Sequence, residues 1–107
     1  MLVTNMNSAR GNAVPNQFVI ENVAIEIDGI LIQGTVFQSY KTVIALYTVD
    51  NVLYLDEKYW DYSKTTMRYL NAFLQEHTFH KSAAKQIVED NRCILADLNA
   101  KNTYAGK

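Results

Sequence analysis

Cysteine, proline and glycine are scarce in this sequence. Its 107 residues include one cysteine, Cys93, one proline, Pro15, and four glycines. A single cysteine excludes an internal disulfide and a zinc site built from several cysteines, and it fits a reducing cytoplasm. No glycine-rich run is present, which excludes the loops that cradle nucleotide phosphates. The scarce residues therefore indicate an ordinary cytoplasmic domain.

The sequence also lacks an excess of either charge and any long apolar run. Its net charge is −1, so no overall charge attracts it to nucleic acid or to anionic lipid. No run approaches the ~20 apolar residues of a membrane-spanning helix. The N-terminus has no signal-peptide pattern of basic residues followed by apolar ones. We expect no membrane association.

The length suits one domain with a modest core. Residues 1–15 are rich in asparagine and hold the only proline, and they predict a flexible N-terminal segment. Residues 16–99 are expected to form a single α+β domain. The polar residues 100–107 predict a flexible tail.

Alternating apolar and polar residues predict a first β-hairpin within residues 17–37. Asp28 and Gly29 favour a type I′ turn, which needs two residues with positive φ. The register that this turn sets sorts four side chains onto one face: Ile25, Ile27, Ile30 and Ile32. Gly34 falls opposite Val23, which predicts a bulge or a close approach of two backbones. A separate short strand is expected at 18–20.

A second hairpin is expected after a loop at residues 37–42. The strand at 43–48 is followed by Asp50 and Asn51, which predict another two-residue turn. That turn would pair Tyr47 with Tyr54. One face of the pair would then carry four exposed candidates: Tyr47, Val49, Val52 and Tyr54.

Two helices are predicted next. Ser63 is favoured over Asp61 as the N-cap of the first, whose expected buried stripe is Met67, Leu70, Phe73, Leu74 and His77. Thr78 is the expected cap of the second helix. This helix either stops at Asn91, followed by a short extended segment at 93–95, or continues to Leu98. The fold class is therefore α+β: an antiparallel β-meander of four to five strands with two α-helices packed on one face.

Four motifs resemble a family of small uncharacterised proteins from bacteriophages and other mobile elements. They are FQSYKTVIA (37–45), YLDEKYWDYSKTT (54–66), RYLNAFL (68–74) and CILADLN (93–99). The resemblance implies a phage or plasmid origin and a cytoplasmic location in a bacterial host cell. It carries no assigned activity. The hairpin at 17–36 is longer than in the family pattern.

Aromatic and acidic residues concentrate around the second hairpin and the start of the first helix. They could form an interaction surface, since Trp and Tyr dominate interface hot spots. The alternative is that the aromatic residues build the core between sheet and helix, while the acids are ordinary surface charge. The protein-interaction candidates are Tyr40, Tyr47, Tyr54, Asp56, Glu57, Tyr59, Trp60 and Asp61.

No catalytic, cofactor or metal site is expected. His77 and His80 would need a third ligand from elsewhere. Cys93 sits in an apolar run, where cysteines are usually inert. Hydroxyl groups such as those of Ser39 and Ser63 more often cap helices and turns than bind phosphate. We therefore expect a protein that is not an enzyme.

The hypothesis from sequence is a small protein-interaction module of a phage or mobile element. It would bind a host or phage protein and inhibit a defence protein such as a CRISPR effector. The alternative is a nucleic-acid-binding accessory protein, whose basic side chains converge with Tyr40 and Tyr59: Lys41, Lys58, Lys64, Arg68, Lys81 and Lys85. A homodimer through an apolar sheet face is also possible.

Overall fold

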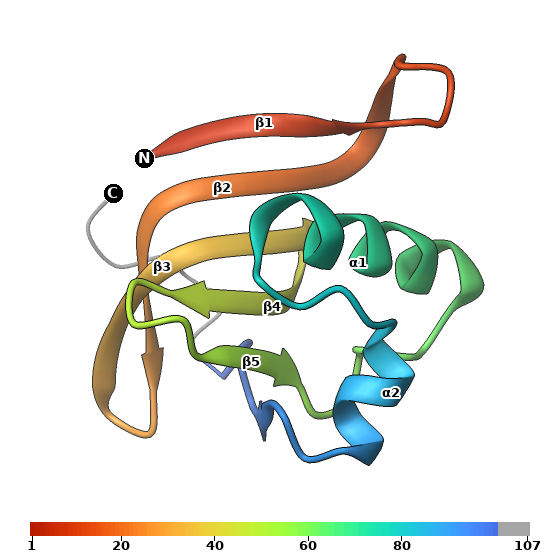
Figure 1. Ribbon diagram of the computed structural model, residues 1–107. Helices are drawn as coiled ribbons and strands as arrows, with labels where there is room; N and C mark the ends of the chain where they lie inside the picture. The colour runs from red at the N-terminus through yellow and green to blue at the C-terminus, as the bar shows by residue number, and fades with distance from the viewer. Residues whose placement is uncertain (101–107) are drawn as a thin grey trace.

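A twisted β-sheet with helices on one face makes up the described part of the chain, residues 1–100 of a computed structural model (Figure 1). In chain order the elements are β1 (Leu2–Asn7), β2 (Ala13–Ile27), β3 (Ile30–Ser39), β4 (Thr42–Thr48), β5 (Leu53–Asp56), α1 (Lys64–His77), α2 (Ala84–Glu89) and β6 (Ile94–Ala96). The strands lie side by side in sequence order, and all neighbours are antiparallel except β5 and β6, which are parallel. The α+β prediction is confirmed, with a six-stranded sheet where four to five strands were expected.

The N-terminal segment, expected to be flexible, instead forms the edge strand β1. It pairs with β2 from Leu2 opposite Glu21 to Asn5 opposite Phe18. Only Met6 of this strand is buried, so an edge strand with one inward side chain leaves no alternating pattern in the sequence. Of the predicted flexible tail, residues 101–107 lie outside the described residues.

The first hairpin has the predicted register, with Ile27 opposite Ile30. Asp28 and Gly29 have φ of 50° and 80°, as a type I′ turn requires. The close approach predicted at Gly34 is also present, because a Cβ there would overlap the backbone of Tyr47 and Thr48 in β4. This position therefore accepts only glycine.

A bulge replaces the predicted break between residues 20 and 23, so that β2 is one long strand. Two residues of β2, 21 and 22, lie opposite Thr35, and Asn22 has φ 57°. The extra residue shifts the alternation by one. As a result, Ile20 and Val23 fall in the same apolar cluster. The two long strands curve markedly, and the β2–β3 hairpin bends away from the helices (Figure 1).

The loop predicted at 37–42 is a tight turn. Strand β3 continues to Ser39 and β4 begins at Thr42, with Tyr40 at φ 55° between them. A second register shift lies between the pairs Phe37–Ala45 and Gln38–Val43, which leaves Ile44 as the extra residue. The polar side chains of this stretch predicted a loop, but most of them belong to the strand ends on either side of a tight hairpin turn.

The predicted register of β4 and β5 is wrong by one residue. Tyr47 pairs with Leu53, because residues 49–51 form a three-residue loop closed by the Thr48 amide donating to the Val52 carbonyl (2.9 Å). The Thr48 hydroxyl accepts hydrogen bonds from the amides of Asp50 and Val52 and holds the loop. This one-residue change moves Tyr47 and Tyr54 to opposite faces of the sheet.

Helix α1 starts as predicted. The Ser63 hydroxyl accepts a hydrogen bond from the Thr66 amide (3.1 Å). The buried face is wider than the predicted stripe, since it includes Thr66 and Tyr69, whereas His77 is exposed and its ring stacks on Phe73. Tyr69 shares an apolar cluster with Met6 of β1, the strand that the sequence did not predict.

Thr78 ends α1 instead of capping α2. Its hydroxyl donates to the Leu74 carbonyl (2.6 Å), and α2 begins only at Ala84, whose amide donates to the Asn71 side chain. Of the two alternatives for the end of α2, the stop near Asn91 is confirmed, with φ 55° at that residue. The chain then enters the short strand β6.

Two apolar clusters lie on the two faces of the sheet. The first joins both helices to the sheet and contains Phe37, Tyr47, Leu53, Leu55, Leu70, Phe73, Leu74 and Ile87. The second contains no helix residue and consists of Ile20, Val23, Ile25, Ile27, Val36, Val43, Leu46 and Leu98. The helices thus cover one face, while the curved hairpin and Leu98 close the other.

Candidate functional site

Two of the predicted interaction residues are buried and are removed from the candidate surface. Tyr47 lies under the helices, where its hydroxyl donates to Asn51 (3.0 Å) and accepts a bond from the Phe79 amide (3.4 Å). Asp56 is only 1% exposed. Tyr47 is therefore a core residue, and Asp56 is a structural one.

The carboxylate of Asp56 joins two distant parts of the chain. One oxygen accepts hydrogen bonds from the amides of Lys58 (3.1 Å) and Tyr59 (3.0 Å). The other accepts bonds from the Leu98 amide and the Asn99 side chain, both at 2.9 Å. These four donors satisfy a buried carboxylate without a cation. We call this arrangement the Asp56 clasp.

Asn99 extends the clasp to strand β4. Its side chain accepts a bond from the Val43 amide (2.8 Å) and donates one to the Val43 carbonyl (2.9 Å). It therefore pairs with the backbone of β4 as a neighbouring strand residue would. The clasp holds Leu98 over the second face of the sheet.

The other predicted residues do not form one surface. Trp60 is partly buried and packs against the helix-side cluster, in agreement with the core alternative. Tyr59 is exposed and contacts Tyr62 edge-on, with ring centroids 5.6 Å apart. Tyr40 is exposed at the β3–β4 turn. The remaining acids, Glu57 and Asp61, are exposed.

Tyr54 does belong to an open apolar surface. Two shallow grooves, of about 330 and 420 Å³, share Ile32 and Tyr54 in their linings. They combine the tip of the β2–β3 hairpin, the β4–β5 loop and β6. We call this the Ile32–Tyr54 surface; its apolar members are Ile30, Leu31, Ile32, Val49, Val52, Tyr54, Ile94 and Leu95.

Acidic residues border this apolar surface. Asp28, Asp50, Glu57 and Asp97 line the two grooves, and no Lys or Arg among the described residues lines either one. Of the predicted candidates, only Tyr54 and Glu57 take part. The sequence indicated Val49 and Val52, but it gave no sign that β6 would bring Ile94 and Leu95 beside the first hairpin.

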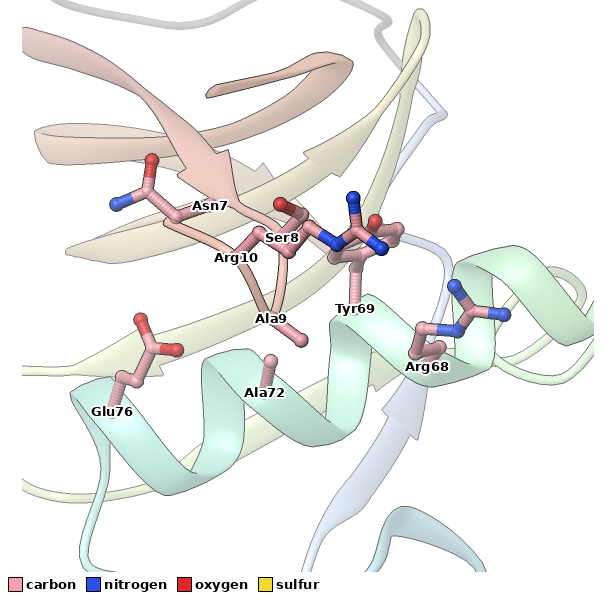
Figure 2. A pocket seen from close by; sticks show the side chains of 8 residues that line it. All are labelled: Asn7, Ser8, Ala9, Arg10, Arg68, Tyr69, Ala72 and Glu76. Carbon is pink, nitrogen blue, oxygen red and sulfur yellow. The ribbon is translucent and has the colours of Figure 1, made fainter. Parts of the chain in front are cut away.

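A second open region lies along α1. A cleft of about 510 Å³ separates the turn at residues 8–12 from the helix (Figure 2). We call it the arginine cleft; it is lined by Asn7, Ser8, Ala9, Arg10, Arg68, Tyr69, Ala72 and Glu76. The turn was not predicted from the sequence; in it the Gly11 amide donates to the Ser8 carbonyl (2.9 Å), and Gly11 has φ 83°.

His80 and Cys93 line a third, shallow groove of about 300 Å³ with Arg92. Burial raises the pKa of the Cys93 thiol. Burial, and then the charge of Arg92, lower the pKa of His80. A raised thiol pKa is opposite to what an activated nucleophile needs.

Within residues 1–100 no group of three or more His, Cys, Asp or Glu side chains is arranged to hold a metal ion. The helices in this range are too short or too polar to cross a membrane.

Comparison with protein families matches residues 1–90 of the chain to a family of unknown function (DUF8033). The chain belongs to this family. The coarse part of the resemblance, an uncharacterised family, is thus confirmed. The matched residues include the β2–β3 hairpin. No curated protein and no solved structure matches the chain.

Proposed function

We propose that this protein acts by binding another protein through the Ile32–Tyr54 surface. The observation that carries the proposal is the gathering of exposed apolar side chains from three segments of the chain beside four carboxylates. Leu31, Val49 and Ile94 are exposed by 59%, 75% and 46%, so this centre loses water only when a partner covers it. Exposed apolar patches with polar borders are typical of protein interfaces.

The acidic rim supports a partner with a basic surface. Asp28, Asp50 and Glu57 form no ion pair with a described residue. Facing carboxylates attract a basic surface and repel an acidic one. The partner would therefore present an apolar centre flanked by Lys and Arg. Such surfaces occur on proteins that bind nucleic acid, where the acids of this protein would take the place of phosphates.

This chemistry fits the hypothesis from sequence. A phage or mobile-element protein that covers the basic surface of a bacterial defence protein, such as a CRISPR effector, would inhibit it without catalysis. The support is the motif resemblance, the small size and the acidic rim. In this view the protein competes with nucleic acid for the partner.

The first test is to capture the partner from a bacterial lysate treated with nuclease and to measure its binding to the purified protein by calorimetry. We expect Leu95→Ser and Val49→Ser to weaken binding at least tenfold. Phe79→Ser removes an apolar side chain that is 79% exposed and lies outside the surface, so it should leave binding unchanged. Equal loss from Phe79→Ser would contradict the assigned surface.

The acidic rim is tested separately with Asp28→Asn, because Asn also tolerates the positive φ of that turn position. It should weaken binding less than the apolar variants and reduce the salt dependence. The matched control is Glu89→Gln, an exposed acid on α2. Retention of nucleic acid by the untreated sample, with no protein captured after nuclease treatment, would support the accessory-protein alternative instead.

Inhibition of a defence system is tested in cells. Co-expression with a CRISPR effector that targets a phage should restore plaque formation. The Leu95→Ser variant should lose this effect and Phe79→Ser should keep it. If the wild-type protein binds its partner but plaque formation never recovers, the result supports the binding function and contradicts the anti-defence role.

A further inference from the structure

The arginine cleft contains two cations whose charge is not neutralised. The ion pairs of the described residues are His77–Glu76 and Arg92–Asp90, so neither Arg10 nor Arg68 has a carboxylate partner there. Both side chains lie toward the same end of the cleft as the Tyr69 hydroxyl (Figure 2). Because neither guanidinium group has a carboxylate partner, an anion bound at this end of the cleft would gain from both positive charges.

Glu76, the one acid among the described residues that line the cleft, lies at its other end (Figure 2). It follows Arg68 by eight residues, which corresponds to about 12 Å along a helix. Glu76 therefore leaves the end with the two arginines free for an external anion. The Glu76 carboxylate lies 3.9 Å from the ring nitrogen Nε2 of its neighbour His77.

Between these ends the lining is apolar. Ala9 from the turn and Ala72 from α1 face each other across the cleft, with Tyr69 beside them (Figure 2). Small side chains on both walls keep the cleft open. Its volume of about 510 Å³ lies in the range of pockets for small organic ligands.

The cleft is framed by ordered backbone. The turn above it is closed by two backbone hydrogen bonds, from Ser8 to Asn12 (2.8 Å) and from Gly11 to Ser8 (2.9 Å). The Asn5 side chain of β1 donates to the Val14 carbonyl of β2 (2.9 Å) and so joins the two strands on either side of the turn. Arg10 is therefore presented by a fixed turn, and Arg68 by a helix.

From this geometry we propose that the arginine cleft binds a small organic anion. The ligand carries a phosphate or carboxylate group, which the two guanidinium groups clamp, on a compact apolar body that fills the space between Ala9 and Ala72. Tyr69 donates a further hydrogen bond to the anionic group. This site is separate from the Ile32–Tyr54 surface and does not depend on the function proposed for that surface.

Amide NMR spectra of the labelled protein, titrated with phenyl phosphate, benzoate and phenol, test the proposal. We expect both anions to shift the amides of Ala9, Arg10 and Ala72 and to bind at least tenfold more tightly than phenol. The anion that binds more tightly shows whether the site prefers phosphate or carboxylate. If phenol binds equally well, or if the shifts lie elsewhere, the proposal is overturned.

Variants then locate the contacts. Arg10→Gln and Arg68→Gln should each weaken phenyl phosphate binding at least tenfold, while Arg92→Gln, whose cation already pairs with Asp90, should not. Ala72→Leu keeps both arginines but fills the cleft and should abolish binding. Equal weakening by Arg92→Gln, or undiminished binding by Ala72→Leu, would overturn the assigned site. Dispersed amide spectra check that each variant is folded.

Discussion

The two faces of the sheet are covered in different ways. On one face, α1 and α2 supply a continuous apolar layer that includes Leu70, Phe73 and Ile87. The other face is closed by the curved β2–β3 hairpin and by Leu98, which the Asp56 clasp holds in place. The comparison teaches that the helical cover follows from apolar residues at helical spacing within one segment of the chain. The second cover depends on a few hydrogen bonds between residues far apart in the sequence.

The largest expected effect is on the helix-covered face. Phe73→Ala removes a fully buried ring that stacks on Phe37 at 5.8 Å. It should lower the free energy of unfolding by about 4 kcal/mol, measured by urea denaturation. Phe79→Ala, at an exposed site, is the control and should change it little. A small loss from Phe73→Ala would mean that the helical cover contributes less than its burial indicates.

Asp56→Asn tests the second cover. The substitution keeps one acceptor but turns the other oxygen into an NH2 donor, which in either orientation faces two of the four groups that donate to Asp56. The loss of these bonds at a buried site should cost about 3 kcal/mol. Asp61→Asn, at an exposed acid, should be nearly neutral in the same denaturation experiment.

A double-mutant cycle shows whether the clasp acts through Leu98. Leu98→Ala alone should cost about 2 kcal/mol. If Asp56 holds Leu98 in place, the combined variant should lose clearly less than the sum of the two single losses. Strict additivity would show that the clasp and the apolar cover are independent.

A buried polar side chain, that of Gln17, lies on the helix-covered face. Gln17 is 1% exposed, and its side-chain oxygen accepts no hydrogen bond from a described residue. It pairs across the strands with Ser39, whose hydroxyl contacts that of Thr66 in α1 at 3.2 Å. Gln17→Met should raise the free energy of unfolding by about 1 kcal/mol, because an unsatisfied buried acceptor is removed. A loss of stability would indicate that this oxygen has a bound water partner.

The smallest expected effect depends on pH. His80 packs edge-on to Tyr47, and its pKa is lowered from 6.5, first by burial and then by Arg92. The folded state therefore resists protonation. Its contribution to stability is complete above pH 6.5 and is lost as the pH falls through the lowered pKa. His80→Gln should flatten this slope in thermal unfolding, and His77→Gln, at an exposed histidine, is the control.

The sequence predicted those parts of the fold that are determined by residues close together in the chain. The turn at Asp28 and Gly29 set a register that the structure confirms, and Ser63 marked the start of α1. The β4–β5 register failed because the Thr48 hydroxyl stabilises a longer loop. A one-residue error was enough to place Tyr47 on the wrong face.

The candidate site was less predictable than the fold. Asp56 looked like a surface acid, although its bond to the Lys58 amide follows the Asx-turn pattern. Its two other donors come from residues 98 and 99, and no local pattern indicates a partner so far along the chain. Both open regions likewise combine distant segments, such as Arg10 with Arg68 and Ile32 with Leu95.

The Asp56 clasp has a practical consequence for choosing recombinant fragments. A fragment that ends after α2 would keep both helices and strands β1 to β5. It would nevertheless remove the two groups, from residues 98 and 99, that donate to one carboxylate oxygen of Asp56. It would also remove the Asn99 side chain that pairs with the amide and the carbonyl of Val43. It would also uncover the apolar side chains beneath Leu98. Such a trimmed protein should be prone to aggregation, so the shortest useful expression boundary lies beyond Asn99.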